Sequence, residues 1–491
     1  MRSRSRVGAA RPSANLAAAD VLPAQDIERL AVQLERAVRR ARKDGEPTLA
    51  TLTLDVGGRF DPIAAVCASR RPGESWFALE QPERDRLAIA GLGEAVRIEA
   101  AGERRFADTA RRWRELSSRA IADPQAPDGG GLLALGGFAF AERGGSSPHW
   151  SGFAPASLVV PEIALTRRVR AGRERGCLSL AALACPDDTA EQLLARLQHG
   201  LARLRSAELP LLDPAPAGRF VLAGGMPPEH YEAAVARATE LIAAGRLEKI
   251  VLAREVQVHA PRAYDAAAVL GVLREEFPAC FVFAVGRGDS VLLGASPELL
   301  VRREGQRVST LALAGSTRRS ADPAVDAHLG EQMLRDALRR EEHAIVARRI
   351  ERTLGAHAVW VAAAPEPTLV RIANIQHLAT PIRAQLAAPM DALELVGAMH
   401  PTPAVGGEPL AEAAPLIPAL EGLDRGWYAG PIGWVDATGD GEFCVALRCA
   451  LLQGATARCY AGNGIVRDAQ PAAELAETEI KLAALLPLLA G

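Results

Sequence analysis

The sequence predicts an α+β protein whose β-sheet core is wrapped by helices. Two pairs of apolar stretches are each joined by a short turn signal, Glu304-Gly305 in one pair and Gln453-Gly454 in the other. Such a pattern is typical of neighbouring antiparallel strands. A long helical pattern separates the two pairs, and short strand-like runs occur among helical segments in the first half of the chain. With 491 residues, the chain is long enough for one large domain or two ordinary ones.

The first half of the chain mixes helices with short strands. Residues 26–43 have the spacing of an amphipathic helix, and two apolar runs have strand character, Leu132–Phe140 and Ala156–Ala164. The second half begins with a helix expected from Pro227 to Leu247, and the apolar run Lys249–Val256 follows it directly as a strand.

The second half contains the paired strands and two more helices. The expected strand pairs are Ser290–Arg303 with Arg307–Leu313, and Phe443–Leu452 with Thr456–Ala461. One long helix is expected from Ala324 to Leu354, because Gly355 is a favourable helix stop. A last helix is expected over Pro471–Lys481, after a glycine-rich loop at Tyr460–Gly464, because proline is tolerated in a first helical turn.

The chain divides into three parts by composition. Residues 1–20 are expected to form a disordered tail, although their arginines and the lack of any acid before Asp20 are also found in organelle transit peptides. A proline-rich connector at residues 208–220 separates an N-terminal α+β half, 21–215, from a C-terminal region, 220–491, in which the candidate site residues are concentrated.

Charge and cysteine content exclude several classes of protein. The 57 basic and 59 acidic residues nearly balance, so nothing draws the chain to nucleic acid or to anionic lipid. Seven scattered cysteines without a C-x-x-C pair argue against a disulfide scaffold and a structural zinc site. There is neither a membrane-length apolar run nor the apolar centre of a secretory signal, so a cytoplasmic protein is expected.

Two charged residues lie in apolar surroundings where acid–base chemistry is conceivable. Glu298 follows Pro297 at a break in an apolar strand; it is either a buried structural glutamate at a bulge, or a general acid whose pKa is raised by burial. Lys249 begins an apolar strand; it is either a strand-end lysine that reaches solvent, or a desolvated general base.

Carboxylates recur on the two later helices. Glu474, Glu477 and Lys481 are spaced i, i+3, i+7 and share one helical face, which is either a solvated stripe or part of a site. With Glu342 of the long helix, they could supply the two glutamates that a hard cation such as Mg²⁺ needs.

Arg448 and two histidines complete the candidates. Arg448 lies within an apolar run and needs an anionic partner, either a protein carboxylate or a substrate. His377 and His400 could each be core histidines whose ring nitrogens bond to the backbone.

Eight motifs in fixed order resemble the chorismate-utilising enzymes, over roughly residues 225–490. The motifs are Lys249-Ile-Val-Leu-Ala-Arg, Gly294-Ala-Ser-Pro-Glu-Leu-Leu, Leu313-Ala-Gly-Ser316, Glu342-His343, Gln376-His377-Leu-x-Thr380, His400-Pro-Thr-Pro-Ala-Val-Gly-Gly, Tyr428-Ala-Gly-Pro-Ile-Gly433, and Ala461-Gly-x-Gly-Ile-Val with Glu474-x-x-Glu477-Thr-x-x-Lys481. The first half is similar to isochorismate synthases in particular, through Trp76–Gly93 and Gly136–Phe140.

This resemblance implies the reaction of an isochorismate synthase, a Mg²⁺-dependent isomerase. Lys249 would act as the general base on a water attacking C2 of chorismate, and Glu298 as the general acid that protonates the departing C4 hydroxyl. Glu342 and Glu477 would hold Mg²⁺, with Glu474 in support.

The resemblance also assigns the residues that bind substrate. Tyr428, Arg448 and the backbone near Gly462 would grip the enolpyruvyl carboxylate; Ser316 would contact the ring carboxylate and His377 would line the ring pocket. Lys481 would tether the glutamate helix or a ligand carboxylate. One departure is Arg339, which stands three positions before the Glu-His pair where several members have an acid, so the surroundings of the metal are expected to differ.

The same comparison favours water over ammonia as the nucleophile. The position of the nucleophilic lysine of aminodeoxychorismate synthases is Ala314, and the tryptophan-sensing motif of anthranilate synthases is replaced by Ala78-Leu-Glu-Gln81. No cysteine has the G-x-C-x-G context of a glutaminase domain, which leaves water as the nucleophile. A water-using synthase requires no partner subunit, so no glutaminase subunit and a monomer are expected. A salicylate synthase and a non-catalytic chorismate-binding subunit remain alternatives, and the pathway, menaquinone or salicylate-derived siderophore, stays open.

Overall fold

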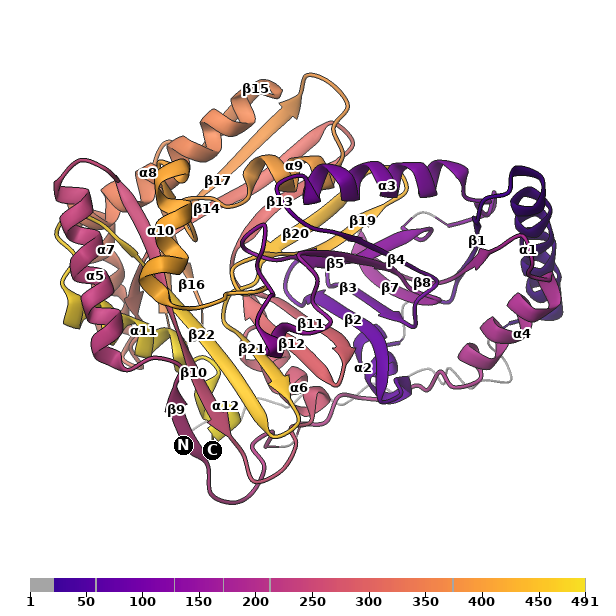
Figure 1. Ribbon diagram of the computed structural model, residues 1–491, viewed down its shortest axis with the longest axis horizontal. Helices are drawn as coiled ribbons and strands as arrows, with labels where there is room; N and C mark the ends of the chain where they lie inside the picture. Colours follow the sequence, from indigo (N-terminus) through magenta and orange to yellow (C-terminus); the bar gives the residue numbers. More distant parts are fainter. Residues whose placement is uncertain are drawn as a thin grey trace.

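The computed structural model describes residues 22–57, 60–127, 129–170, 172–211, 213–372 and 375–490. The expected tail at residues 1–20 lies outside the described residues. Two antiparallel sheets dominate the described part, and helices cover their outer sides and ends (Figure 1). The predicted α+β fold with a sheet core is confirmed.

The first sheet has twelve strands among the described residues and spans the whole molecule. In spatial order its strands are β1 (Thr48–Asp55), β8 (Arg173–Ala184), β7 (Ile163–Arg170), β3 (Leu87–Leu92), β2 (Gly73–Gln81), β11 (Phe281–Gly288), β12 (Ser290–Ser296), β21 (Cys449–Gln453), β22 (Thr456–Ile465), β10 (Lys249–His259) and β18 (Gly407–Glu408), with β9 (Val221–Gly224) also paired to β10.

The second sheet has ten described strands. Their order is β15 (Ala358–Ala363), β17 (Ile375–Leu386), β14 (Arg307–Arg318), β13 (Leu299–Glu304), β20 (Gly441–Val445), β19 (Pro431–Asp436), β5 (Leu133–Phe138), β6 (Ala156–Val160) and β4 (Val96–Ala100), with β16 (Thr368–Arg371) also paired to β17. Both sheets contain strands from each side of the expected connector; for example, β2 pairs with β11. The connector itself lies between α4 and β9, and the two-part division stays a prediction.

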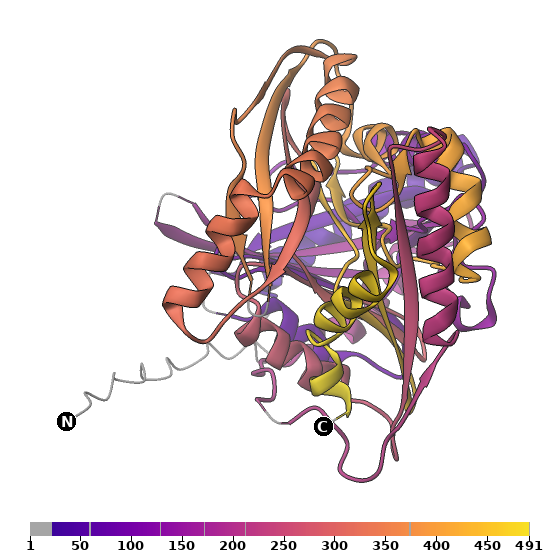
Figure 2. The ribbon, with the colours of Figure 1, turned by 90° about the vertical axis from the view of Figure 1, so that its left-hand side faces the viewer.

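Helices lie outside the sheets and at the end where the site forms. They are α1 (Ala24–Asp44), α2 (Pro62–Ser69), α3 (Arg105–Arg119), α4 (Ala190–Leu201), α5 (Pro228–Ala243), α6 (Ala266–Glu276), α7 (Pro323–Arg335), α8 (Ala337–Gly355), α9 (Ala392–Met399), α10 (Leu410–Glu421), α11 (Pro471–Leu482) and α12 (Leu486–Ala490), with a short 3₁₀ turn at Pro148–Trp150. Figure 2 shows α11 (yellow) between α8 (orange) and α5 (magenta). No described helix is long and apolar enough to span a membrane.

Successive side chains along the strands of the first sheet point alternately into two separate hydrophobic cores. In β2, Phe77 and Leu79 join the core that the two sheets share, whereas Trp76 and Ala78 face the core beneath the helices α1, α2, α4 and α6. Both faces of this sheet are therefore buried, because strand side chains point alternately to opposite sides. This explains why central strands of this sheet such as β2 and β11 are buried over most of their length.

The chain passes between the sheets at two neighbouring points. Residues 290–303 were expected to form one strand interrupted near Pro297; instead β12 lies in the first sheet and β13 in the second, with Pro297 and Glu298 between them. Residues 443–452 divide in the same way into β20 and β21, around residues 446–448. The crossings are joined, because the Val445 N–H donates to the Glu298 carbonyl at 3.1 Å and the Ala295 N–H donates to the Arg448 carbonyl at 3.1 Å.

Two other expected elements are each divided in the structure. The helix expected over residues 324–354 is α7 followed by α8, because the Asp336 carboxylate accepts hydrogen bonds from the Leu338 and Arg339 N–H groups and so begins a new helix. The strand expected over Ala156–Ala164 is β6 followed by β7, which belong to different sheets.

Candidate active site

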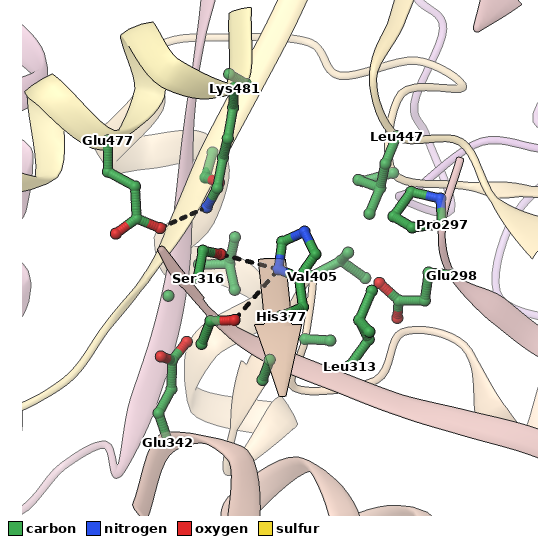
Figure 3. Close-up of a pocket in the computed structure, with 18 of the residues that line it drawn as sticks. Pro297, Glu298, Leu313, Ser316, Glu342, His377, Val405, Leu447, Glu477 and Lys481 are labelled. Atoms are coloured by element: carbon green, nitrogen blue, oxygen red, sulfur yellow. Dashed lines mark hydrogen bonds and ion pairs between the residues drawn. The ribbon is translucent and has the colours of Figure 1, made fainter. Parts of the chain in front are cut away.

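One cavity brings together every site residue that the sequence predicts. It lies where the sheet crossings meet the start of β10, the middle of β14 and the helices α8 and α11 (Figure 3). Its lining includes Lys249, Glu298, Ser316, Glu342, His377, Tyr428, Arg448, Gly462, Glu474, Glu477 and Lys481. The glutamate face of α11 therefore points into this cavity and is not a solvated stripe. His400 lies elsewhere, buried with its Nε2 3.0 Å from the Phe140 carbonyl, as expected of a core histidine.

Lys249 is one of the largest fully buried side chains, with 1% of its surface exposed. Its Nζ lies 3.0 Å from Glu342 Oε1, so the first residue of β10 is joined to the first half of α8. Gly464, on the neighbouring strand β22, makes room for this pair. A Cβ at position 464 would lie 2.4 Å from both Glu342 Oε1 and Lys249 Cε. The glycine is thus required by close approach of side chains.

Glu298 occupies the first sheet crossing and is 4% exposed. Its backbone N–H donates to Ser296 Oγ at 3.2 Å and its carbonyl is held by Val445, so the crossing fixes its direction. Burial raises the pKa of the Glu298 carboxyl to about 8, although Lys249 and Arg448 oppose the shift. Figure 3 shows the carboxyl beside Leu313 and Leu447, across the cavity from Glu342 and Glu477. This carboxyl can hold a proton at neutral pH.

His377 is held as a neutral ring between β14 and Arg448. Gly315 is a β-bulge residue with φ +72°, and the bulge sets Ser316 opposite His377. His377 Nδ1 lies 3.1 Å from Ser316 Oγ and 3.2 Å from the Gly315 carbonyl. Burial lowers the pKa of His377 to about 3. With Nδ1–H donated to the carbonyl, Nε2 is left as an acceptor, and Arg448 Nη2 lies 3.2 Å from it.

Arg448 presents a cation to the cavity without a carboxylate partner among the described residues. It lies at the second sheet crossing with φ +47°, a strained conformation for arginine that the crossing imposes. Burial lowers the pKa of its guanidinium. Its only described side-chain hydrogen bond goes to a neutral imidazole, so an anionic ligand is the partner that would offset its charge. The alternative of a protein carboxylate is not what the structure shows.

Tyr428 is buried beside this arginine at the far wall of the cavity. Its ring stacks on Tyr460 at a centroid distance of 5.1 Å, and Tyr460 stacks in turn on Trp150 at 5.9 Å. Burial raises the pKa of Tyr428, so its hydroxyl keeps its proton and can donate a hydrogen bond.

Glu477 is held by two cations. Its Oε1 lies 2.9 Å from Lys481 Nζ, and its Oε2 lies 3.2 Å from Arg339 Nη1. Burial acts to raise its pKa, but Lys481 and Arg339 outweigh burial and lower it to about 2. Lys481 also donates to the Gly462 carbonyl at 3.0 Å and to Asn463 Oδ1 at 2.7 Å. All three of its donors are used within the protein, which favours a tethering role over a ligand contact.

The pKa of Glu474 is raised, whereas that of Glu477 is lowered. Its Oε2 accepts from Asn463 Nδ2 at 2.9 Å. Burial, followed by the charge of Glu477 and to a smaller extent that of Glu342, raises its pKa to about 7. The three glutamates of α8 and α11 are therefore close enough to influence one another electrostatically.

Asn463 contacts Glu474 and Arg339 contacts Glu477, and the sequence predicted neither contact. The stretch Tyr460–Gly464 was expected as a loop but belongs to β22, and its glycines are there for close approach. In a strand, alternation places Asn463 on the side of α11, where it bonds both Glu474 and Lys481. Recognising the strand would have pointed to Asn463. Arg339 was noted only as a departure from the family pattern.

Carboxylate oxygens are a suitable type of ligand for a hard cation such as Mg²⁺. Among the described residues, no three His, Cys, Asp or Glu side chains are gathered closely enough to hold a metal ion on their own. Mg²⁺ usually takes one or two protein carboxylates and completes its shell with water and substrate oxygens. Glu342 and Glu477, which face one cavity from two helices, meet that smaller requirement.

Comparison with known proteins identifies the family. The model of the chorismate binding enzyme family matches residues 34–490, and the chain belongs to this family. The resemblance read from its motifs is confirmed.

Several relatives of this chain are isochorismate synthases. The salicylate biosynthesis isochorismate synthase of Pseudomonas aeruginosa is 37% identical over 452 residues, which is 92% of each chain. Isochorismate synthase MenF of Bacillus subtilis is 32% identical over 421 residues, 84% of this chain and 88% of that one. The solved structure of the menaquinone-specific isochorismate synthase MenF of Escherichia coli superimposes with a TM-score of 0.75 at 26% identity, over 94% of this chain and 99% of that one.

Proposed function

We propose that this protein is an isochorismate synthase, an isomerase that converts chorismate to isochorismate. The relatives that match most of its length carry this activity in their names, and the chain covers nine-tenths of one of them. The observation that carries the proposal is the meeting of a buried lysine and a buried, proton-holding glutamate in one cavity, Lys249 and Glu298.

In the proposed reaction, one hydroxyl is added as another leaves. Lys249 takes a proton from a water whose oxygen bonds to C2 of chorismate. The ring double bonds shift, the C4–O bond breaks, and Glu298 gives its proton to the departing hydroxyl, which leaves as water. The high pKa of Glu298 supports its role, because a general acid must hold its proton at the working pH. Atoms balance, since one water enters and one leaves.

The substrate carboxylates are proposed to meet the cationic and hydroxyl groups of the cavity. Arg448 and Tyr428 would bind the enolpyruvyl carboxylate, with backbone near Gly462. Ser316 would contact the ring carboxylate, and His377 would line the ring and aim Arg448 through their 3.2 Å contact. A rigidly held guanidinium positions a planar carboxylate by two hydrogen bonds.

Mg²⁺ is proposed as the cofactor, held by Glu342 and Glu477 with Glu474 in support. When bound, it would offset the charge of the ring carboxylate beside these glutamates. Lys481 would keep α11 against β22 through its bonds to Gly462 and Asn463. Action without a glutaminase subunit, as a monomer, remains a prediction.

A product assay tests the proposal against its nearest rival. Pure protein with chorismate and Mg²⁺ should form isochorismate, and fluorescent salicylate should appear only when a separate pyruvate-lyase is added. Salicylate without that lyase would identify a salicylate synthase instead. No consumption of chorismate would favour a non-catalytic chorismate-binding subunit. The relatives' names point to both salicylate and menaquinone routes, so the assay addresses the reaction and leaves the pathway to genetic context.

A further inference from the structure

Arg339 lies among the carboxylates that are proposed to hold the metal. It sits in the first turn of α8, three residues before Glu342, so the two side chains share a helical face. Its Nη1 is 3.2 Å from Glu477 Oε2 on α11. The side chain packs beside the bulge at Gly315, where an added Cβ would be 3.6 Å from Arg339 Cβ. Arg339 also lines the cavity itself.

The guanidinium of Arg339 interacts electrostatically with all three glutamates of the cavity, Glu342, Glu474 and Glu477. Burial acts to lower the pKa of Arg339, but Glu477, Glu342 and Glu474 all act to raise it, and together they prevail. Each oxygen of Glu477 already has a cationic partner, Lys481 on one side and Arg339 on the other. A divalent cation that bound Glu477 would lie close to both of these cations and would be repelled by them.

Of the two cations that contact Glu477, Arg339 is the one that can move away. Lys481 is fixed by two further hydrogen bonds to β22 and its side chain is 8% exposed. Arg339 makes no other described side-chain hydrogen bond, and its side chain is 33% exposed, so it can turn towards solvent. A guanidinium left next to a divalent cation would be repelled by it.

We propose that Arg339 is an internal counter-ion that competes with Mg²⁺ for Glu477, and that it moves outwards when the metal binds. This rests on the proposed metal role of Glu342 and Glu477. Arg339 is thus a positioning residue that stabilises the metal-free cavity and weakens metal affinity, and it has no part in the proton transfers.

The test is a metal-binding measurement on three proteins. Arg339→Gln removes the competing charge, whereas Arg340→Gln removes the neighbouring charge on the same helix, which bonds Glu366 and the Leu334 carbonyl away from the cavity. Titration calorimetry with MgCl₂, on protein stripped with EDTA and without chorismate, gives each dissociation constant. Arg339→Gln should bind Mg²⁺ about tenfold more tightly than wild type, the size expected for one charge-assisted contact at a partly exposed site.

Further readouts make the test decisive. Arg339→Lys keeps the charge but loses the forked donors of the guanidinium. It should bind Mg²⁺ with a dissociation constant between those of wild type and Arg339→Gln. In EDTA, Arg339→Gln should melt below wild type, and saturating Mg²⁺ should raise its melting temperature by more than it raises that of wild type. Equal constants for wild type and Arg339→Gln, an equal gain in Arg340→Gln, or no Mg²⁺ uptake by wild type and Arg339→Gln would each overturn the proposal. The product assay stands apart: formation of isochorismate with equal constants would remove the role of Arg339 alone.

Discussion

The Nζ of Lys249 lies 3.0 Å from Glu342 Oε1, which joins the start of β10 directly to α8. Lys249 is the proposed base and Glu342 a proposed metal ligand, so proton transfer and metal binding are adjacent. The pair is buried, and removal of one partner leaves the other charge without its closest counter-charge. The two residues are therefore expected to depend on each other.

Replacement of Lys249 by Ala should lower kcat by about 10²–10⁴-fold, the range for loss of a general base. The measurement is chorismate consumption at saturating substrate, with near-ultraviolet circular dichroism to check the fold. Glu342 would then lack its buried partner, so the melting temperature should also fall. An Ala variant that is folded and fully active would refute the assignment of Lys249 as the base.

Gly464→Ala should disturb the same pair without removing either charge. The new methyl group would lie 2.4 Å from Lys249 Cε and from Glu342 Oε1, so both must move. We expect a loss of about 1–3 kcal/mol in the free energy of unfolding and a clear fall in kcat. Gly355→Ala is the matched control, because nothing lies within 4 Å of its added Cβ and it ends α8. Equal behaviour of the two variants would contradict the close fit at Gly464.

The pH profile should report the proton on Glu298. Burial raises the pKa of this carboxyl to about 8, so the acid is protonated below pH 8 and loses its proton above it. Activity that needs the proton is therefore full below this pKa and should fall about tenfold per pH unit above it. Glu298→Gln should retain little activity and lack this high-pH fall, measured as kcat/KM from pH 6 to 10. The same fall in the Gln variant would assign it to another group.

Arg448→Gln should act mainly on substrate binding. The guanidinium has no carboxylate partner among the described residues, so its loss leaves no buried anion behind. KM for chorismate should rise about 10–100-fold, as expected for the loss of a charged hydrogen-bond donor, while the melting temperature changes little. Initial rates over a range of chorismate concentrations give KM and kcat separately. A lower kcat with unchanged KM would place Arg448 in the chemical step instead.

The sequence indicated Glu298 as the proposed acid but not the reason for its position. Glu298 stood out as a charge after Pro297 in an apolar run. That this run leaves one sheet for another at that point depends on which strands pair, and pairing is set by tertiary packing more than by local preference. The same applies to Arg448, which was placed within a strand and lies at a crossing.

The environment of the proposed metal site could be predicted least. The family motifs supplied Glu342, Glu474 and Glu477, and the structure places them in one cavity. The contact of Arg339 with Glu477 depends on the direction of α8, which begins at the Asp336 cap that helical periodicity did not indicate. A local hydrogen bond that competes with a continuous helix is hard to recognise from spacing alone.

The most direct test of the account is the origin of the new hydroxyl oxygen. Chorismate should be incubated with the protein and Mg²⁺ in water enriched in ¹⁸O, and the isochorismate formed should be analysed by mass spectrometry. Attack of water at C2 with loss of the C4 hydroxyl predicts that each isochorismate molecule carries one ¹⁸O atom, at C2. Isochorismate without the label, formed by migration of the original hydroxyl, would contradict the roles given to Lys249 and Glu298.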